Sequence, residues 1–70
     1  MNADSIRQIL QRRPFEPFEV RMTNGDAQAA RHPENAWLAG SRLLIHDPAT
    51  DRLAMCSLLH IAAIHMLQPS

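Results

Sequence analysis

The sequence has few of the features that hold a very small domain together. Cys56 is the only cysteine among seventy residues, which excludes an intramolecular disulfide and a zinc site made of several cysteines. A chain of this length buries only about 60% of its unfolded surface, so its stability is marginal. We therefore expect one small domain over residues 1–70, with association between copies as the extra source of burial.

The chain also lacks an excess of either charge. Seven basic and seven acidic residues balance, every basic residue is an arginine, and lysine and tyrosine are missing. A neutral chain does not have the basic excess of a simple nucleic-acid binder. No apolar run approaches the length of a membrane span, and the first residues do not form a signal peptide. We expect a cytoplasmic protein that does not bind membranes.

Residues 5–13 are predicted to form a short helix. The apolar residues at helical spacing are Ile6, Ile9 and Leu10. Ser5 with Gln8 fits a capping box, and Asn2 or Asp4 is an alternative cap. Pro14 is expected to end the helix, because the residue before a proline is pushed out of helical geometry. A helix of about two turns needs a surface to pack against.

Residues 18–67 are predicted to form a sheet that begins with a hairpin. The segment 18–23 alternates apolar and polar residues, which is the period of a half-buried strand. Asn24-Gly25 is a strong hairpin signal, and it predicts a second strand over 27–32 in spite of low strand propensity there. Residues 42–47 and 52–57 are predicted as the third and fourth strands, separated by a loop at 47–51.

Residues 58–67 fit two structures. Leu58, Ile61, Ile64 and Leu67 are spaced by three, which suits one face of a helix. The same residues fit a one-turn helix followed by a short strand that ends near Met66. Periodicity does not decide between the two for a short apolar run, and propensity alone favours the helix.

The segment RRPFEPFEVRMTNGDAQAARHPE, residues 12–34, resembles a widespread family of short bacterial proteins of unknown function. In that family a short helix precedes Arg-Pro-Phe-x-Pro-Phe, and a strand, a glycine-containing turn, a second strand and His-Pro-Glu follow. The matching residues are Arg13, Pro14, Phe15, Pro17, Phe18, Gly25, His32, Pro33 and Glu34. The resemblance implies a turn plus a strand for residues 58–67. It also implies a small SH3-like or Sm-like barrel of about five antiparallel strands, and no established activity.

The opening motif has a functional and a structural interpretation. Pro14-Phe15-Glu16-Pro17 fits the P-x-x-P core of a polyproline ligand, but Gln11 and Glu19 stand where such ligands need a basic residue. The structural interpretation is a joint between helix and sheet. Phe15 and Phe18 would anchor the helix, and Pro17 would begin a strand where no backbone donor is needed. We favour the joint.

The histidines and the cysteine suggest chemistry only weakly. His32 beside Glu34 has no third partner for acid–base or metal chemistry, so we interpret His32-Pro33-Glu34 as a turn in which Glu34 or Asn35 caps a following short turn. A second group of possible ligands is His46, Asp47, Asp51, His60 and His65. Nothing in the sequence shows that these residues converge, and we expect no metal site and no other cofactor.

Cys56 and His60 would lie one turn apart if residues 58–67 were helical, which is the start of a thiolate–imidazole pair. A barrel this small has little room for the cleft and oxyanion site that such a nucleophile needs. We expect Cys56 to be a small buried apolar residue. The sequence therefore predicts a protein that is not an enzyme.

Arg12, Arg13, Arg21 and Arg31 are the candidate contacts for phosphates or a partner, because the helix end and the hairpin arms would bring them near one another. Nearby Glu16, Glu19 and Asp26 would neutralise much of this patch. The predicted core is Ile6, Ile9, Leu10, Phe15, Phe18, Val20, Met22, Trp37, Leu43, Ile45, Leu53, Met55, Ile61 and Ile64.

Three functions follow from these observations. The first is a non-enzymatic interaction module that forms homo-oligomers through an edge strand or an apolar face and binds a protein partner. The second is an Sm-like ring that binds RNA through the four arginines. The third, a small metal- or cysteine-dependent enzyme, has the least support.

Overall fold

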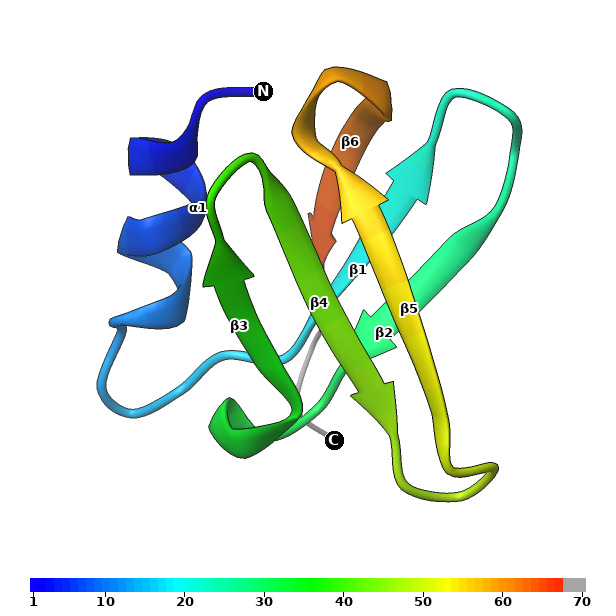
Figure 1. The fold of residues 1–70 in the computed structure, drawn as a ribbon. Coiled ribbons are helices and arrows are strands. Elements are labelled where there is room, and N and C mark those ends of the chain that lie inside the picture. The colour runs from blue at the N-terminus through cyan, green and yellow to red at the C-terminus, as the bar shows by residue number, and fades with distance from the viewer. Residues whose placement is uncertain (68–70) are drawn as a thin grey trace.

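The computed structural model describes residues 1–67 as a mainly β fold with one N-terminal helix (Figure 1). Helix α1 spans Ala3–Leu10, and the strands are β1 (Phe18–Met22), β2 (Ala27–Ala30), β3 (Ala36–Ala39), β4 (Arg42–Asp47), β5 (Arg52–Ser57) and β6 (Ile61–Met66). Two short 3-10 turns are η1 (Pro33–Asn35) and η2 (Leu58–His60). Residues 68–70 of the predicted domain lie outside the described residues. No helix within residues 1–67 is long and apolar enough to cross a membrane.

Helix α1 begins and ends earlier than the predicted range 5–13. Asn2, one of the two alternative caps, accepts a hydrogen bond from the backbone N–H of Ser5 at 2.8 Å. At the other end, the Arg13 guanidinium donates to the carbonyl of Leu10 at 3.1 Å. In a longer helix this carbonyl would need the N–H of residue 14, but Pro14 has none. The Arg13 guanidinium supplies a donor in its place, and the helix ends at Leu10.

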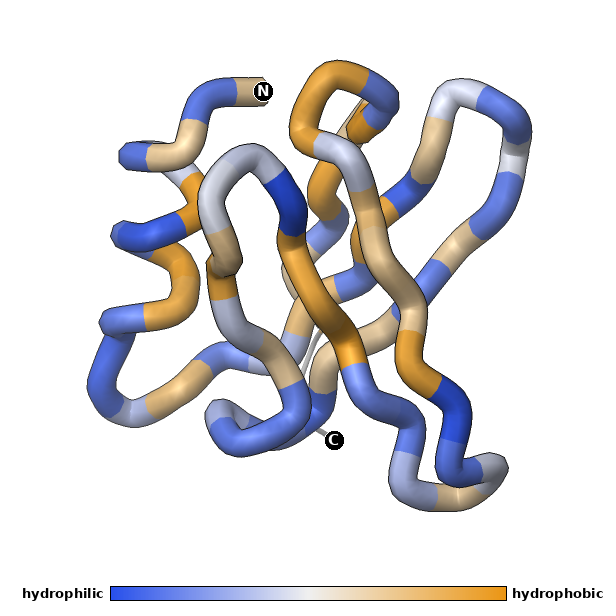
Figure 2. Tube along the Cα trace, in the orientation of Figure 1, coloured by the Kyte–Doolittle hydropathy of each residue, from blue (hydrophilic) through white to orange (hydrophobic). Residues whose placement is uncertain are grey.

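The strands form two antiparallel sheets of three strands each. One sheet has the order β2-β1-β6 and the other the order β3-β4-β5, and η1 joins β2 to β3. The β3–β4 pair is the difference from the predicted count of about five strands. Residues 36–39 were not predicted as a strand, but they pair with β4, and the chain turns back at Gly40-Ser41. The apolar middle of β4 is visible in Figure 2.

The predicted hairpin is confirmed. Phe18 pairs with Ala30 and Arg21 with Ala27, and the N–H of Met22 donates to the carbonyl of Asp26 at 2.8 Å. Gly25 has a φ of 95°, which a side chain would disfavour. The second strand ends at Ala30 and not at residue 32, because Pro33 starts η1.

Residues 58–67 form a single 3-10 turn and then a strand, as the family resemblance implies and against the helix that propensity favours. Strand β6 pairs with β1, with Ile64 opposite Val20. The N–H of Leu67 also donates to the carbonyl of Pro17 at 2.9 Å. Pairing with the free edge of β1 therefore makes this segment a strand. Such pairing joins residues that are distant in the sequence, so local propensity does not predict it.

The core lies between the two sheets and the helix. Its buried members are Ile6, Phe18, Val20, Ala30, Ala36, Leu43, Ile45, Cys56, Leu58 and Ile61. The remaining predicted core residues Ile9, Leu10, Phe15, Met22 and Ile64 are partly buried against it. The prediction was wrong for Trp37, Leu53 and Met55, which are exposed. In β5 the smaller residues Ala54 and Cys56 face inward, because they pair with Ile45 and Leu43 of β4.

Candidate functional site

The outer face of the β3-β4-β5 sheet carries four large apolar side chains. Trp37, Leu44 and Met55 are directly opposite one another on the three strands. Directly paired residues share a face of the sheet, and Leu53 joins them because it lies two residues from Met55. We call these four residues the apolar face. Trp37 is 43% exposed, Leu53 54% and Met55 70%, and Leu44 is partly buried between its neighbours.

The apolar face points outward because the inner face of the same sheet is filled by other residues. Leu43 and Ile45 of β4 and Cys56 of β5 are buried. They alternate with Leu44 and Met55, so each pair of neighbours contributes one side chain to the core and one to the outside. Leu44, which was not in the predicted core, accordingly lies on the outer face. A half-buried strand alternates apolar and polar residues. The unbroken apolar run Leu43-Leu44-Ile45 departs from that alternation, and it was the sign in the sequence that both faces of this strand are apolar.

Charged side chains stand at both ends of the apolar face, and the end that carries Asp51 also includes Arg52, which lies opposite Asp47. Arg42 lies at one end, paired with Ser57 and Ala39, and it forms no ion pair with any of residues 1–67. His46 lies at the other end, opposite Leu53, and its Nε2 is 3.0 Å from Oδ1 of Asp51. The Asp51 side chain is almost fully exposed. The face therefore has a basic end and an end that carries a carboxylate.

The four candidate arginines do not form a free basic patch. Arg12 pairs with Glu16 at 2.8 Å and Arg21 with Glu19 at 3.1 Å. The Arg13 guanidinium donates to backbone carbonyls, including that of Arg12 at 2.7 Å. Both acidic partners were expected to neutralise this region.

Arg21 and Arg31 lie at opposite ends of the first hairpin. Arg21 lies near the turn of the first hairpin, opposite Ala27, whereas Arg31 follows Ala30 at the far end of β2. Asp26, the third expected neutralising residue, bonds instead to Asn24 within the turn. Phosphate binding by all four arginines together therefore has little geometric support.

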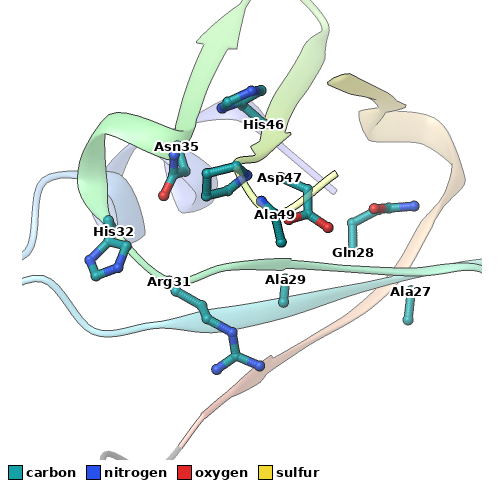
Figure 3. A pocket seen from close by; sticks show the side chains of 10 residues that line it. Ala27, Gln28, Ala29, Arg31, His32, Asn35, His46, Asp47 and Ala49 are labelled. Carbon is teal, nitrogen blue, oxygen red and sulfur yellow. Dashed lines mark hydrogen bonds between the residues drawn. The ribbon is translucent and has the colours of Figure 1, made fainter. Parts of the chain in front are cut away.

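A shallow pocket of about 340 Å³ brings together several residues that the sequence considered separately (Figure 3). It lies between β2, η1 and the turn after β4, and its polar lining residues are Gln28, Arg31, His32, Asn35, His46 and Asp47. In Figure 3, Arg31 projects from the side of β2 opposite to Gln28 and Asp47. The polar groups do not converge on one point, so the pocket does not define an acid–base pair or an anion site.

The metal and cysteine candidates also have little geometric support. Within residues 1–67, no three His, Cys, Asp or Glu side chains are placed to hold a metal ion. Cys56 is buried as expected, and burial raises the pKa of its thiol. Because residues 58–67 are not a single helix, the premise that placed His60 one helical turn from Cys56 is wrong. A neutral buried thiol is a poor nucleophile.

The opening motif forms a joint between the helix and the sheet. Phe18 is fully buried, and the ring of Phe15 packs 6.0 Å from it, centroid to centroid, at 53°. Pro17 precedes β1 and contributes only its carbonyl to the sheet. His32-Pro33-Glu34 is a turn, in which the N–H of Asn35 donates to the carbonyl of His32 at 3.0 Å.

The expected side-chain cap on that turn is not formed in the described part of the chain. Asn35 is buried instead. The sequence matches no protein-family model and no curated protein. Among the described residues, the apolar face gathers exposed large apolar side chains from neighbouring strands of one sheet.

Proposed function

We propose that the protein is a non-enzymatic interaction module that self-associates and binds a protein partner. The observation that carries this proposal is the apolar face, which places Trp37, Leu53 and Met55 in contact with solvent. Single exposed apolar residues are common on proteins, but a contiguous group rimmed by polar residues is typical of an interaction surface. The buried free thiol is compatible with the reducing cytoplasm, where we place the module.

We infer further that the fold is a small SH3-like or Sm-like barrel. Its support is the chain path: β1 and β2 form one side, η1 turns the chain, and β3 continues into the second sheet around a shared core. A strongly bent sheet of this kind has an inner face filled by side chains. On such a fold we place the function on the outside, at the apolar face.

Light scattering on the purified protein across the micromolar range tests self-association. We expect a mass above that of one 7.9 kDa chain. A mass of one chain throughout the range would contradict the self-association part of the proposal. Met55→Arg, at a residue 70% exposed, should shift the mass towards one chain without unfolding the protein, because an exposed side chain contributes little to the core.

An RNA-binding Sm-like ring is the alternative proposal, with Arg12, Arg13, Arg21 and Arg31 as its contacts. It is the weaker one because two of these arginines already pair with glutamates. Only three aromatic residues exist to stack on bases, and two of them belong to the joint. A mobility shift of single-stranded RNA at low salt, lost as salt rises, would favour this alternative over the first proposal.

A further inference from the structure

The position of the exposed tryptophan distinguishes two ways in which copies could associate. Trp37 lies on β3, at one edge of its sheet, whereas β5 is the other edge. Pairing through the free edge of β5 would bring Leu53 and Met55 together but would leave Trp37 in solvent. Packing of one face on another would cover all four apolar residues at once. The distribution of the apolar side chains across three strands therefore favours contact through the face.

We propose that the apolar face is covered by the same face of a second copy, around a two-fold axis that runs across the strands. This inference rests on the proposed self-association and specifies its partner and geometry. Two antiparallel sheets commonly pack face to face about 10 Å apart. In this arrangement Leu44 meets Leu44 of the second copy at the centre, with the tryptophans on one side and the Met55 side chains on the other.

The charges at the ends of the face determine the direction of the axis. A two-fold axis parallel to the strands would leave the position of each residue along the strand direction unchanged. It would therefore place Arg42 against Arg42 of the second copy. An axis perpendicular to the strands reverses the strand direction. Arg42 then meets the end of the second copy that carries His46 and Asp51. Arg42 has no acidic partner among residues 1–67, and the Asp51 carboxylate is almost fully exposed. Two equivalent Arg42–Asp51 pairs would form, one on each side.

The size of the face is compatible with a weak dimer. Three strands at a spacing of about 4.8 Å and six residues at about 3.3 Å each cover roughly 280 Å² in projection. The two copies together therefore contribute roughly 560 Å² in projection, which is below the limit of about 1,000 Å² for a stable specific interface and belongs to a weak, transient one. We therefore expect a micromolar dissociation constant, so that dilution separates the copies.

The single tryptophan makes the geometry measurable, because all tryptophan fluorescence comes from Trp37. Sedimentation and fluorescence would be recorded on the same dilution series of the full chain. We expect a monomer–dimer equilibrium in which the emission of Trp37 shifts to shorter wavelength, and its quenching by acrylamide decreases, as the dimer forms. This measurement needs no variant. A dimer whose Trp37 emission does not change with dilution would overturn the face-to-face geometry and leave self-association standing, whereas a monomer at all concentrations would overturn both.

Two matched substitutions locate the interface. Met55→Arg should weaken the dimer by about 30-fold or more, because it places a charge where an apolar side chain is covered by the second copy. Met66→Arg makes the same chemical change on β6, in the other sheet, where the methionine is also exposed. It should leave the dissociation constant unchanged. Equal weakening by both variants would overturn the assignment of this face.

Arg42→Ala tests the direction of the axis. With the axis across the strands the variant loses two ion pairs, and the dimer should weaken about two- to five-fold, more at low salt than at high salt. With the axis along the strands the variant would remove a repulsion, so a tighter dimer would overturn the proposed axis.

Discussion

At the scale of the residue, Phe18 and Phe15 both join the helix to the sheet, but they are buried to different extents. Phe18 is fully buried in the core, whereas Phe15 is partly buried and packs on its ring. We expect Phe18→Ala to lower the free energy of unfolding by roughly 3–5 kcal/mol, because it leaves a cavity as well as losing burial. Phe15→Ala should lose about 1–2 kcal/mol, since part of this ring is already in water.

Urea unfolding followed by circular dichroism measures both values. The chain is small and its total stability is limited, so Phe18→Ala is expected to be largely unfolded at 37 °C. Equal losses for the two variants would show that the two rings are equivalent parts of the core. A loss well under one kcal/mol at Phe15 would restore the interpretation of this motif as an exposed ligand.

Cys56 gives the protein a pH dependence that can be assigned to one side chain. Burial raises the pKa of its thiol, so the folded state keeps the proton after the unfolded chain has released it. The stabilisation is complete below the unfolded pKa of about 8.5 and is lost as pH rises from there towards the folded pKa. The chain has no lysine and no tyrosine, so no other side chain ordinarily titrates between about pH 8.5 and 10.

We therefore expect the free energy of unfolding to fall as pH rises through this range. Cys56→Ala serves as the control: it is less stable overall, and its stability should fall clearly less over the same range. A thiol reagent should label native protein slowly at pH 7 and unfolded protein rapidly. Rapid labelling of the native state would contradict the buried position of the thiol.

At the scale of the element, the first hairpin depends on one glycine. Gly25 has a φ of 95°, and its N–H donates to the carbonyl of Met22 at 3.0 Å. We expect Gly25→Ala to destabilise the protein by about 1–2 kcal/mol, because a Cβ disfavours this conformation. Gly25→Asn should lose less, since asparagine tolerates positive φ better than other residues. Thermal unfolding of the two variants would show the order; a neutral alanine variant would mean that the turn adapts.

The same hairpin shows what the sequence could predict. Its strand alternates clearly and is followed by Asn24-Gly25, so local signals agree with the tertiary structure. The helix was predicted in kind but not in its bounds. Pro14 was expected to affect only the residue before it, but its missing N–H also leaves the carbonyl of Leu10 without a helical donor. The choice between helix and strand for residues 58–67 depended on the pairing with β1, which no local pattern contains.

Strand β5 shows why the apolar face was not predicted from the sequence. Residues 53–56 are all apolar, so the period of two gives no contrast between the faces, and the larger residues were assigned to the core. Pairing with β4 assigns Ala54 and Cys56 inward instead. Leu53 and Met55, two exposed residues of the apolar face, were therefore predicted to lie in the core.

At the scale of the whole molecule, self-association should make stability depend on concentration. Anything that binds only the folded state stabilises it, and here the ligand is the protein itself. We expect the midpoint of thermal unfolding to rise by about 3–6 °C for each tenfold increase in concentration above the dissociation constant. Calorimetry at several concentrations would measure this rise, and Met55→Arg should remove it. A midpoint independent of concentration in the parent chain would contradict a dimer that dissociates on unfolding.

The pairing of β1 with β6 determines the order in which the fold can be completed. Strands β3, β4 and β5 are consecutive hairpins and can assemble from neighbouring segments as the chain leaves the ribosome. Strand β1, although it is synthesised early, lacks one of its two partners until β6 has emerged. Contacts between distant segments form slowly, because the intervening chain must first be brought together. Until β6 has emerged, β1 can pair only with β2, so one of its two edges has no partner from within the chain.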